Sequence, residues 1–308
     1  MALNKIPKLR PKSEKFYRSS PSNCHSIGSA PATFGELIQG REPITNDDFL
    51  VTFPITLNSV AKFYGFKSSE NLYVFPVRKR KSLKAAQLFL DRFNIKTGGI
   101  LEISSDVREG KGLASSSADL VATLRALANY FNVEMQAHDL FAIMRQIEPT
   151  DGVMFDDAVS FFHRKVELKD VIGRLPRICI LAVDEGGAVD TISYNKKNFD
   201  FSSEEKENYA NLLLGVTKAI REKDVKQIGY LATMSTRLHQ KRNHKKTLDK
   251  LEGLLEQVAA EGVINCHSGT FIGLCFDATS PESLDKILCA ERFLEKELQK
   301  PIYKFFSR

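Results

Sequence analysis

The chain has 308 residues, of which 43% are apolar and 27% charged, and these values exclude a small disulfide-stapled module, a collagen or coiled coil, and a wholly disordered chain. The formal net charge is +6, but residues 1–25 alone carry six basic side chains against Glu14. The rest of the chain is almost neutral, so the positive net charge of the protein is no evidence that its folded part binds nucleic acid. We expect residues 1–25 to form a flexible basic arm.

The cysteine pattern and the hydropathy of the chain indicate a compartment and a class of partners. The five cysteines lie far apart and include no CxxC pair, so we expect neither a disulfide framework nor a zinc site. No stretch approaches the roughly 18 apolar residues of a membrane-spanning helix, and residues 1–25 contain no apolar signal region. We expect a cytoplasmic protein that binds neither a membrane nor nucleic acid. We leave open whether the protein forms a homodimer.

The first half of the chain predicts a mixture of strands and helices. Segments rich in Val, Phe, Thr and Tyr indicate strands, and apolar residues at helical spacing indicate amphipathic helices. The strongest helical pattern comes from Leu120, Leu124 and Leu127, which recur along one face. The expected strands are 49–66, 72–77 and 99–107, and the expected helices are 82–93, 114–131 and 136–147.

The second half predicts the same mixture. The charged stretch "RKVELKDVIGR" interrupts the apolar pattern, so we place a boundary near 165–178 and divide the body into an N-terminal domain, 26–170, and a C-terminal domain, 171–308. The expected elements are strands at 158–168 and 177–184, three helices across 204–260, a β-rich segment at 262–277, a helix at 281–298 and a short strand at 302–306.

The segment "VREGKGLASSSADLVATLRAL", residues 107–127, is the most informative motif. Gly110 and Gly112 are followed by a run of small residues that leads directly into the best predicted helix. Glycine and serine let a ligand approach the backbone closely, and the N–H groups at a helix N-terminus favour an anion such as a polyphosphate. The segment is not a Walker A loop, because Lys111 precedes the second glycine. An ordinary serine N-cap after a glycine-containing loop is the alternative.

Two other segments combine small residues with polar side chains. The segment "APATFGELIQG" at 30–40 contains Glu36 and Gln39, and "INCHSGTFIGL" at 264–274 contains His267, Ser268, Gly269 and Thr270. We expect both to form loops near the ligand. An acidic segment, "IEPTDGVMFDDAVSFF" at 147–162, supplies Glu148 and Asp151, which are the oxygen donors that phosphoryl transfer with Mg²⁺ requires.

Near the start, middle and end of the chain, these three small-residue segments resemble the three motifs of the GHMP kinase superfamily, whose members phosphorylate small metabolites with ATP. Within it, "GELIQG", "EPTDGVMF" (148–155) and "VDEGGAVDT" (183–191) are similar to the branch of bacterial L-threonine kinases that serve the cobalamin side chain, with Phe34 at the position of a cysteine. The resemblance implies a two-domain α+β fold, with an S5-like N-terminal domain and a ferredoxin-like C-terminal domain.

The resemblance also implies an activity and a role for particular residues. The activity is transfer of the γ-phosphoryl group of ATP to the hydroxyl of L-threonine, with Asp151 as the catalytic residue. Mg²⁺ would be held by Glu148 and Ser117, with Ser116 the less favoured hydroxyl. The acceptor would contact Glu36, Gln39, His267, Ser268, Gly269 and Thr270. The phosphates would lie against Gly110, Lys111, Gly112, Leu113, Ala114, Ser115, Ser116 and Ser117.

Structural alternatives remain open for these residues. Asp151 fits an ordinary Asp-Gly turn, Glu148 fits the end of a helix, and His267 fits a loop histidine bonded to a backbone carbonyl. The acceptor could be another hydroxylated amino acid or a sugar, such as serine or homoserine, and the fold could serve a regulator without turnover. We expect His163 and His239 to lie at the surface, and the basic run 78–84 to cover a solvated helix face.

Overall fold

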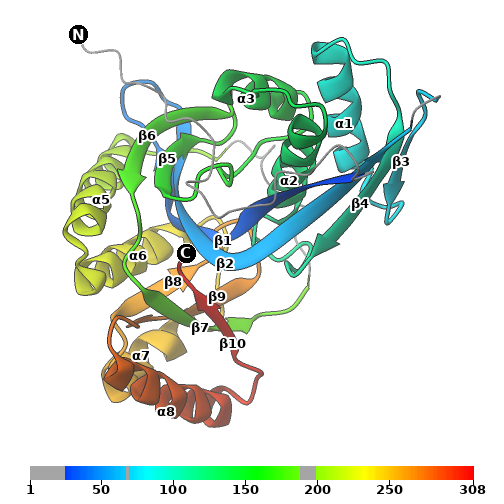
Figure 1. Ribbon diagram of the computed structural model, residues 1–308. Coiled ribbons are helices and arrows are strands. Elements are labelled where there is room, and N and C mark those ends of the chain that lie inside the picture. The colour runs from blue at the N-terminus through cyan, green and yellow to red at the C-terminus, as the bar shows by residue number, and fades with distance from the viewer. Residues whose placement is uncertain (1–24, 67–68, 188–198) are drawn as a thin grey trace.

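The computed structural model describes residues 25–66, 69–187 and 199–308, which form two β-sheets with helices packed against them (Figure 1). Residues 1–24, nearly all of the predicted basic arm, lie outside the described residues. In the part of the chain that the structure describes, no helix has the length and apolar character needed to cross a membrane.

The first sheet is formed by the chain before residue 174. Its strand order is β3-β4-β2-β5-β6, and β1 pairs with β2 in antiparallel register. Only the β3–β4 pair is parallel. The strands are β1 (His25–Arg41), β2 (Asp48–Gly65), β3 (Leu72–Phe75), β4 (Gly99–Ser105), β5 (Ala158–Phe162) and β6 (Glu167–Gly173).

Three helices, α1 (Arg80–Arg92), α2 (Ser115–Tyr130) and α3 (Ala137–Arg145), pack against this sheet (Figure 1). Helix α2 lies along β1 and β2. Its small residues allow a close approach: a Cβ atom on Gly28 of β1 would stand 2.3 Å from the carbonyl oxygen of Ala122. The alanines between the leucines of α2 therefore bring the beginning of this helix close to the strands.

The second sheet has the strand order β10-β7-β9-β8, and all its pairs are antiparallel. If the four strands are numbered 1 to 4 along the chain, their order across the sheet is 4-1-3-2. This is the order of a ferredoxin-like arrangement, as the resemblance implied. Alternate residues of β7 face opposite sides, one side packing on α5 and α6 and the other on α7 and α8. The elements are β7 (Ile178–Asp184), α5 (Ser203–Glu222), α6 (Val225–His239), α7 (Leu248–Val258), β8 (Gly262–Asn265), β9 (Phe271–Asp277), α8 (Pro281–Leu298) and β10 (Tyr303–Phe306).

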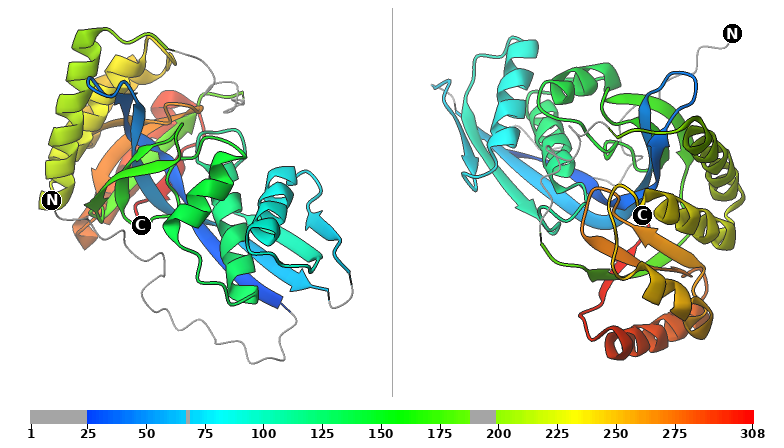
Figure 2. Two further views of the ribbon diagram at one scale, coloured as in Figure 1. Left: turned by 90° about the horizontal axis from the view of Figure 1, so that it is seen from above. Right: turned by 180° about the vertical axis from the view of Figure 1, so that it is seen from behind.

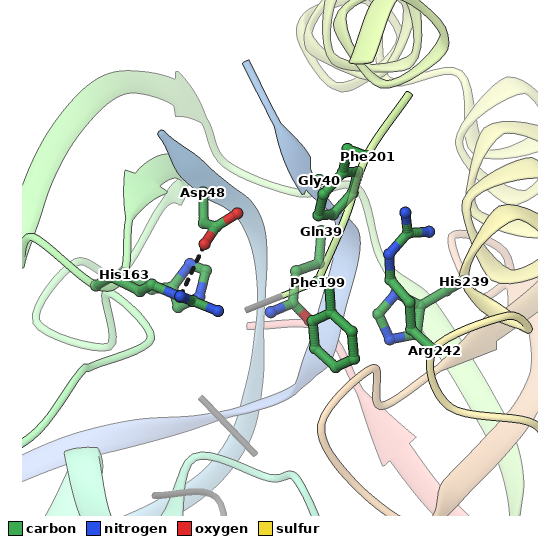
Figure 3. A pocket seen from close by; sticks show the side chains of 9 residues that line it. Gln39, Gly40, Asp48, His163, Phe199, Phe201, His239 and Arg242 are labelled. Atoms are coloured by element: carbon green, nitrogen blue, oxygen red, sulfur yellow. Dashed lines mark ion pairs between the residues drawn. The ribbon is translucent and has the colours of Figure 1, made fainter. Parts of the chain in front are cut away.

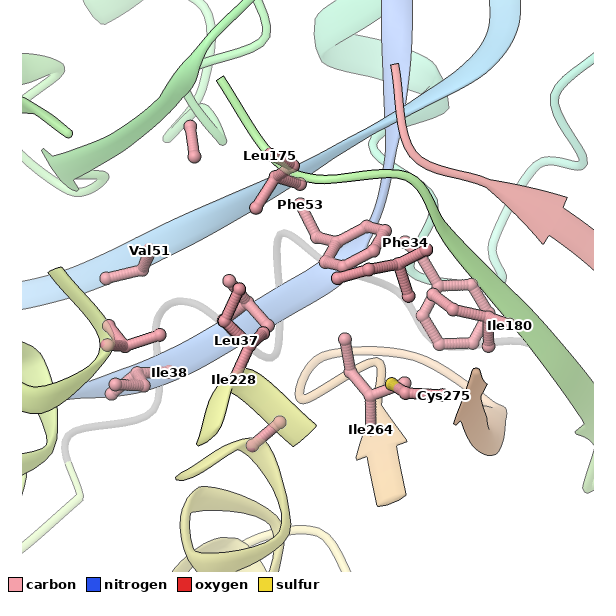
Figure 4. Close-up of a cluster of buried hydrophobic side chains, with 14 of the residues drawn as sticks. Phe34, Leu37, Ile38, Val51, Phe53, Leu175, Ile180, Ile228, Ile264 and Cys275 are labelled. Atoms are coloured by element: carbon pink, nitrogen blue, oxygen red, sulfur yellow. The ribbon is translucent and has the colours of Figure 1, made fainter. Parts of the chain in front are cut away.

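One hydrophobic cluster joins the two sheets. Phe34 and Leu37 of β1 pack with Ile180 of β7, Ile228 of α6 and Ile264 of β8, and all five are fully buried (Figure 4). The two views in Figure 2 show α5 and α6 beside β1 of the first sheet. The chain leaves the first sheet after Gly173 and enters the second at residue 178, inside the region where we expected a boundary. The division into separate domains at residue 170 stays a prediction.

Two expectations about local structure were wrong. The segment 30–40 is not a loop but part of β1, because its apolar side chains are buried between sheet and helices. Its pairing with β2 shifts register three times, and Gly35 has a φ of +51°, so the small residues mark irregularities in a strand. The predicted strand 158–168 is a hairpin, with β5 and β6 separated by a turn in which Val166 has a positive φ.

Candidate active site

The three small-residue motifs meet in space. A Cβ atom on Gly35 would stand 2.5 Å from the Cα of Cys266, and one on Gly112 would stand 2.6 Å from the Cα of Gly269. Real Cβ atoms do not approach so closely, and Gly112 has a φ of +82°, so both positions require glycine. The glycines of the first and middle motifs therefore pack against the third motif, and Gly112 faces protein backbone rather than open space.

The N-terminus of α2 opens onto a pocket of about 380 Å³. Its N-cap is Ala114 in the left-handed conformation, and no side chain caps the first turn, so the predicted alternative of a serine N-cap does not hold. Uncapped N–H groups and the helix dipole favour an anion here. Of the predicted phosphate-binding residues, seven line the pocket, namely Gly110, Gly112, Leu113, Ala114, Ser115, Ser116 and Ser117.

Lys111, the eighth residue of that prediction, is not among the residues that line the pocket. Its ammonium group lies 2.6 Å from a carboxylate oxygen of Asp184 and donates to the carbonyl of Gly187. Asp184 also accepts a hydrogen bond from the Thr270 hydroxyl at 2.7 Å. Lys111 and Thr270 therefore tie the middle and third motifs to the end of β7.

Two lysines of the run that we expected to be solvated line the same pocket instead. Lys79 lies 2.5 Å from Asp119 and 2.8 Å from Glu109, and Lys81 lies 2.5 Å from Glu148. Both belong to the beginning of α1, where the helix dipole disfavours cations. Basic side chains at a helix N-terminus are thus a sequence signal that partners of opposite charge lie nearby.

Glu148 lies beside the N-terminus of α2. The Ser116 hydroxyl donates to one of its carboxylate oxygens, and Lys81 holds the other. Ser117 also lines the pocket but is not the hydroxyl that contacts Glu148. The structure therefore brings together Glu148 and the less favoured of the two predicted metal-binding serines.

Asp151 lines the pocket beside Glu148. Asp151 also precedes a turn glycine, Gly152, with a φ of +70°. It therefore stands before a turn glycine, as the alternative predicted, and also lines the pocket. Burial raises the pKa of the Asp151 carboxyl well above its usual range, and the nearby carboxylates of Glu36 and Glu148 raise it further. Burial likewise raises the pKa of Glu36 to about 7. The site thus holds three crowded carboxyl groups that a cation would stabilise.

His267 is fully buried and supports Glu36. Its backbone N–H donates to Glu36 at 3.1 Å, its Nδ1 lies 3.3 Å from the same carboxylate oxygen, and its Nε2 lies 3.0 Å from the Ser235 hydroxyl. Burial, reinforced by Lys245, lowers the pKa of His267 to about 3, so the ring is neutral. Among the six residues predicted to contact the acceptor, Ser268 is the one that lines this pocket.

Gln39 lies in a different, smaller pocket, between Asp48 and His163 on one side and His239 and Arg242 on the other (Figure 3). Both histidines are 2% exposed. The expectation that they lie at the surface was wrong, because His239 packs edge-on against the buried ring of His267 and the carbonyl of His163 accepts a hydrogen bond from Thr150 inside the fold.

The oxygen donors of the larger pocket suit a magnesium ion. In the described residues, no group of three His, Cys, Asp or Glu side chains forms a metal site by itself. Mg²⁺ is usually held by one or two carboxylates together with phosphate oxygens, however, and rarely by a cage of protein ligands alone. Ser116, Glu148 and Asp151, which all line this pocket, match the protein part of that donor set.

Comparisons with known proteins find a family model, curated relatives and solved structures that are similar to this chain. Residues 80–164 match the model of the GHMP kinases N terminal domain. The L-threonine kinase of Citrobacter freundii is 25% identical over 82% of this chain and 86% of its own length, and that of Salmonella typhimurium is 26% identical over 82% and 83%. A homoserine kinase from Cytophaga hutchinsonii superimposes with a TM-score of 0.71 at 15% identity, over 96% of this chain and 97% of its own. The L. major mevalonate kinase gives 0.67 at 16%, over 93% and 96%.

The family match and the relatives named as kinases support an ATP-dependent kinase. Residues 80–164 match the GHMP kinases N terminal domain, and this match, with the similarity to two L-threonine kinases and the superposition on solved kinases, confirms the resemblance and the fold expected from the three motifs. The expected enzyme class, an ATP-dependent kinase, is confirmed as well.

Proposed function

We propose that the protein transfers the γ-phosphoryl group of ATP to the side-chain hydroxyl of L-threonine, giving O-phospho-L-threonine and ADP. The observation that carries this proposal is the similarity to two L-threonine kinases along most of both chains. The carboxyl cluster beside an anion-binding helix N-terminus supports it, because a phosphoryl donor and a hydroxyl acceptor need those two features side by side.

The nucleotide would bind with its phosphates at the beginning of α2. The loop from Gly110 to Ser117 offers backbone N–H groups, and the ammonium groups of Lys79 and Lys81 line the same pocket. In this proposal the two lysines exchange part of their pairing with Asp119 and Glu148 for the phosphate oxygens. Positioning and electrostatic stabilisation would then account for most of the rate enhancement.

Mg²⁺ would be held by the Ser116 hydroxyl and the Glu148 carboxylate together with phosphate oxygens, with Ser117 as the second candidate hydroxyl. When bound, the ion neutralises charge that develops on the transferred group. Glu148 is already fixed by Ser116 and Lys81, so its oxygens are oriented toward the pocket before any ligand binds.

Asp151 would face the acceptor hydroxyl. A carboxylate there can orient the hydroxyl and receive its proton during direct in-line transfer. The raised pKa of Asp151 is typical of a functional carboxyl group, because burial and neighbouring charges that perturb a pKa are common at active sites. Glu36, which accepts a hydrogen bond from the backbone of His267, would affect the protonation of Asp151, because its negative charge raises the pKa of that carboxyl group.

The experiment is an acceptor screen that measures ADP release with the purified protein, ATP, Mg²⁺ and one candidate acceptor at a time. The proposal expects the highest kcat/KM with L-threonine. Homoserine is the second candidate, because the homoserine kinase superimposes over nearly the whole chain. A higher kcat/KM with homoserine, serine or a sugar would replace threonine as the acceptor, and no acceptor-dependent ADP release would overturn the proposal.

A further inference from the structure

Lys79 is paired with two carboxylates that differ in how firmly they are held. Its ammonium group lies 2.5 Å from Asp119 and 2.8 Å from Glu109. The Asp119 side chain is 5% exposed, whereas that of Glu109 is 51% exposed. All three residues line the pocket at the N-terminus of α2. The two partners of one lysine therefore differ in their freedom to move when a ligand enters.

Asp119 is fixed by a third element of the fold. The Ser59 hydroxyl of β2 donates to one carboxylate oxygen of Asp119 at 2.5 Å, and Lys79 donates to the other. Ser59 is fully buried, and Asp119 belongs to the second turn of α2, so neither can follow a ligand outward. Hydrogen bonds to a charged group are stronger than those between neutral groups. Ser59 and Asp119 thus hold the ammonium group of Lys79 in one place.

Glu109 is the less firmly held partner. It lies in the loop before α2, directly ahead of Gly110, and its other basic neighbour is Arg78 at 3.5 Å, whose side chain is 66% exposed. The hydrogen bond from Lys79 lowers the pKa of Glu109, so its carboxylate is ionised at neutral pH. Exposed ion pairs contribute little to stability, because water and salt screen both charges. An anion of higher charge can therefore replace Glu109 beside Lys79.

The ammonium group of Lys79 stays charged in the pocket. Burial opposes its charge, but the hydrogen bonds to Asp119 and Glu109 outweigh burial and raise the pKa of Lys79 above its usual range. An ammonium group has three N–H donors, and the bond to Asp119 uses one of them. Once Glu109 withdraws, the other donors can bind phosphate oxygens while Asp119 stays in contact. The position of the Lys79 backbone is set as well, since this residue is the N-cap of α1.

We propose that Ser59 and Asp119 are positioning residues for nucleotide binding: they hold Lys79 in the pocket, and the phosphates of the nucleotide displace Glu109 but leave Asp119 in place. This inference rests on the proposed function, in which the phosphates bind at the N-terminus of α2, but it does not depend on which acceptor is used. It assigns opposite effects to two carboxylates that contact the same lysine. Asp119 promotes nucleotide binding, whereas Glu109 competes with the nucleotide.

The test is calorimetry with a non-hydrolysable ATP analogue and Mg²⁺, in the absence of any acceptor. Ser59→Ala removes the hydrogen bond that fixes Asp119 and leaves every charge in the pocket unchanged, so Kd for the analogue is expected to rise roughly threefold or more. Glu109→Gln removes the competing charge with almost no change in size, so Kd is expected to fall roughly threefold. Ser104→Ala, at an exposed position of β4, is the control for the loss of a hydroxyl.

A second measurement shows whether Ser59 acts through Lys79. Lys79→Met removes the ammonium group, and in this background Ser59→Ala is expected to leave Kd unchanged. A general effect of Ser59→Ala on folding would instead appear in both backgrounds. Thermal unfolding of each variant shows whether it is folded. If Lys79→Met does not fold, the opposite effects of Ser59→Ala and Glu109→Gln decide alone.

Three outcomes would overturn the inference. The first is an unchanged Kd in Ser59→Ala, and the second is a Kd in Glu109→Gln that is no lower than that of the wild type. The third is an equal effect of Ser59→Ala with and without the ammonium group of Lys79. If the wild type does not bind the analogue at all, the proposed function fails and the inference fails with it. If the wild type binds the analogue and the variants behave like it, the inference alone fails.

Discussion

The Ser116 hydroxyl donates a hydrogen bond to a carboxylate oxygen of Glu148, although the two residues are 32 positions apart in the chain. The first belongs to the beginning of α2, and the second lies between α3 and the hairpin of β5 and β6. This contact brings an uncapped helix N-terminus and a buried carboxylate to the same wall of the pocket. In the proposed function, the metal-nucleotide complex binds beside this contact.

The first prediction concerns the two candidate hydroxyls. Ser116→Ala should lower kcat and raise the Mg²⁺ concentration that gives half-maximal activity, roughly tenfold, because one oxygen ligand is lost while the backbone of the loop remains. Ser117→Ala is the matched control and should change both values less. Activity measured against Mg²⁺ concentration decides the matter. The reverse order of the two variants would return the metal site to Ser117.

The second prediction concerns Asp151. Asp151→Asn keeps the size of the side chain and removes its charge, so kcat should fall by something on the order of 10²–10⁴ while ATP affinity barely changes. Folding should survive, since Asn is accepted before a turn glycine and a neutral side chain relieves repulsion from Glu36. Steady-state kinetics and ATP binding test this together. A loss in kcat below about threefold would assign Asp151 to the turn alone.

The third prediction concerns stability and pH. Glu36 has a pKa of about 7 in the folded protein against 4.5 in a free side chain, so the folded state holds a proton that the unfolded state has lost. Stability of the nucleotide-free protein should therefore fall as pH rises from about 4.5 to 7, by up to about 3 kcal/mol from this group. The raised pKa of Asp151 acts in the same direction.

Urea unfolding of the wild type and of Glu36→Gln across this pH range measures the contribution of Glu36. The difference in unfolding free energy between the two proteins should change with pH in the stated direction. Glu134→Gln, at an exposed position, is the control and should show no such change. A constant difference between wild type and Glu36→Gln would contradict the buried, proton-holding state of Glu36.

The fourth prediction concerns Gly112. Gly112→Ala should lower Tm and destabilise the protein by about 2 kcal/mol or more, because its Cβ would meet the backbone of Gly269 and its φ is +82°. Gly253→Ala is the control, since this glycine of α7 faces open space and alanine favours a helix. Thermal unfolding of both variants is the measurement. A Gly112→Ala protein as stable as the wild type would show that the two motifs do not pack as described.

The sequence was sufficient to predict most helices, most strands and the glycine-containing loop before α2, which lines the larger pocket. In that loop the glycines, the small residues and the helix that follows form one local pattern, so no distant residue is needed to recognise it. Asp151 also lies in a short local motif, beside a turn glycine, and it lines the same pocket, while its catalytic role stays a prediction. The fold class was predictable because motifs at the start, middle and end of the chain resembled one superfamily.

What could not be predicted depends on contacts between distant segments. The small residues of 30–40 favoured a loop, but burial between the sheet and α5 and α6 makes this segment a strand. Lys79 and Lys81 are typical of a solvated surface until Asp119 and Glu148 are placed beside them by the fold. The choice between two adjacent serines likewise depends on which one the first turn of α2 directs toward Glu148.

The central claim is tested most directly by identifying the product. The wild-type protein, incubated with ATP, Mg²⁺ and L-threonine, should form O-phospho-L-threonine and ADP in equal amounts, as measured by ³¹P NMR and mass spectrometry. The Asp151→Asn protein under the same conditions should still bind ATP and form almost no product. ADP without phosphothreonine, or equal product from both proteins, would contradict the account.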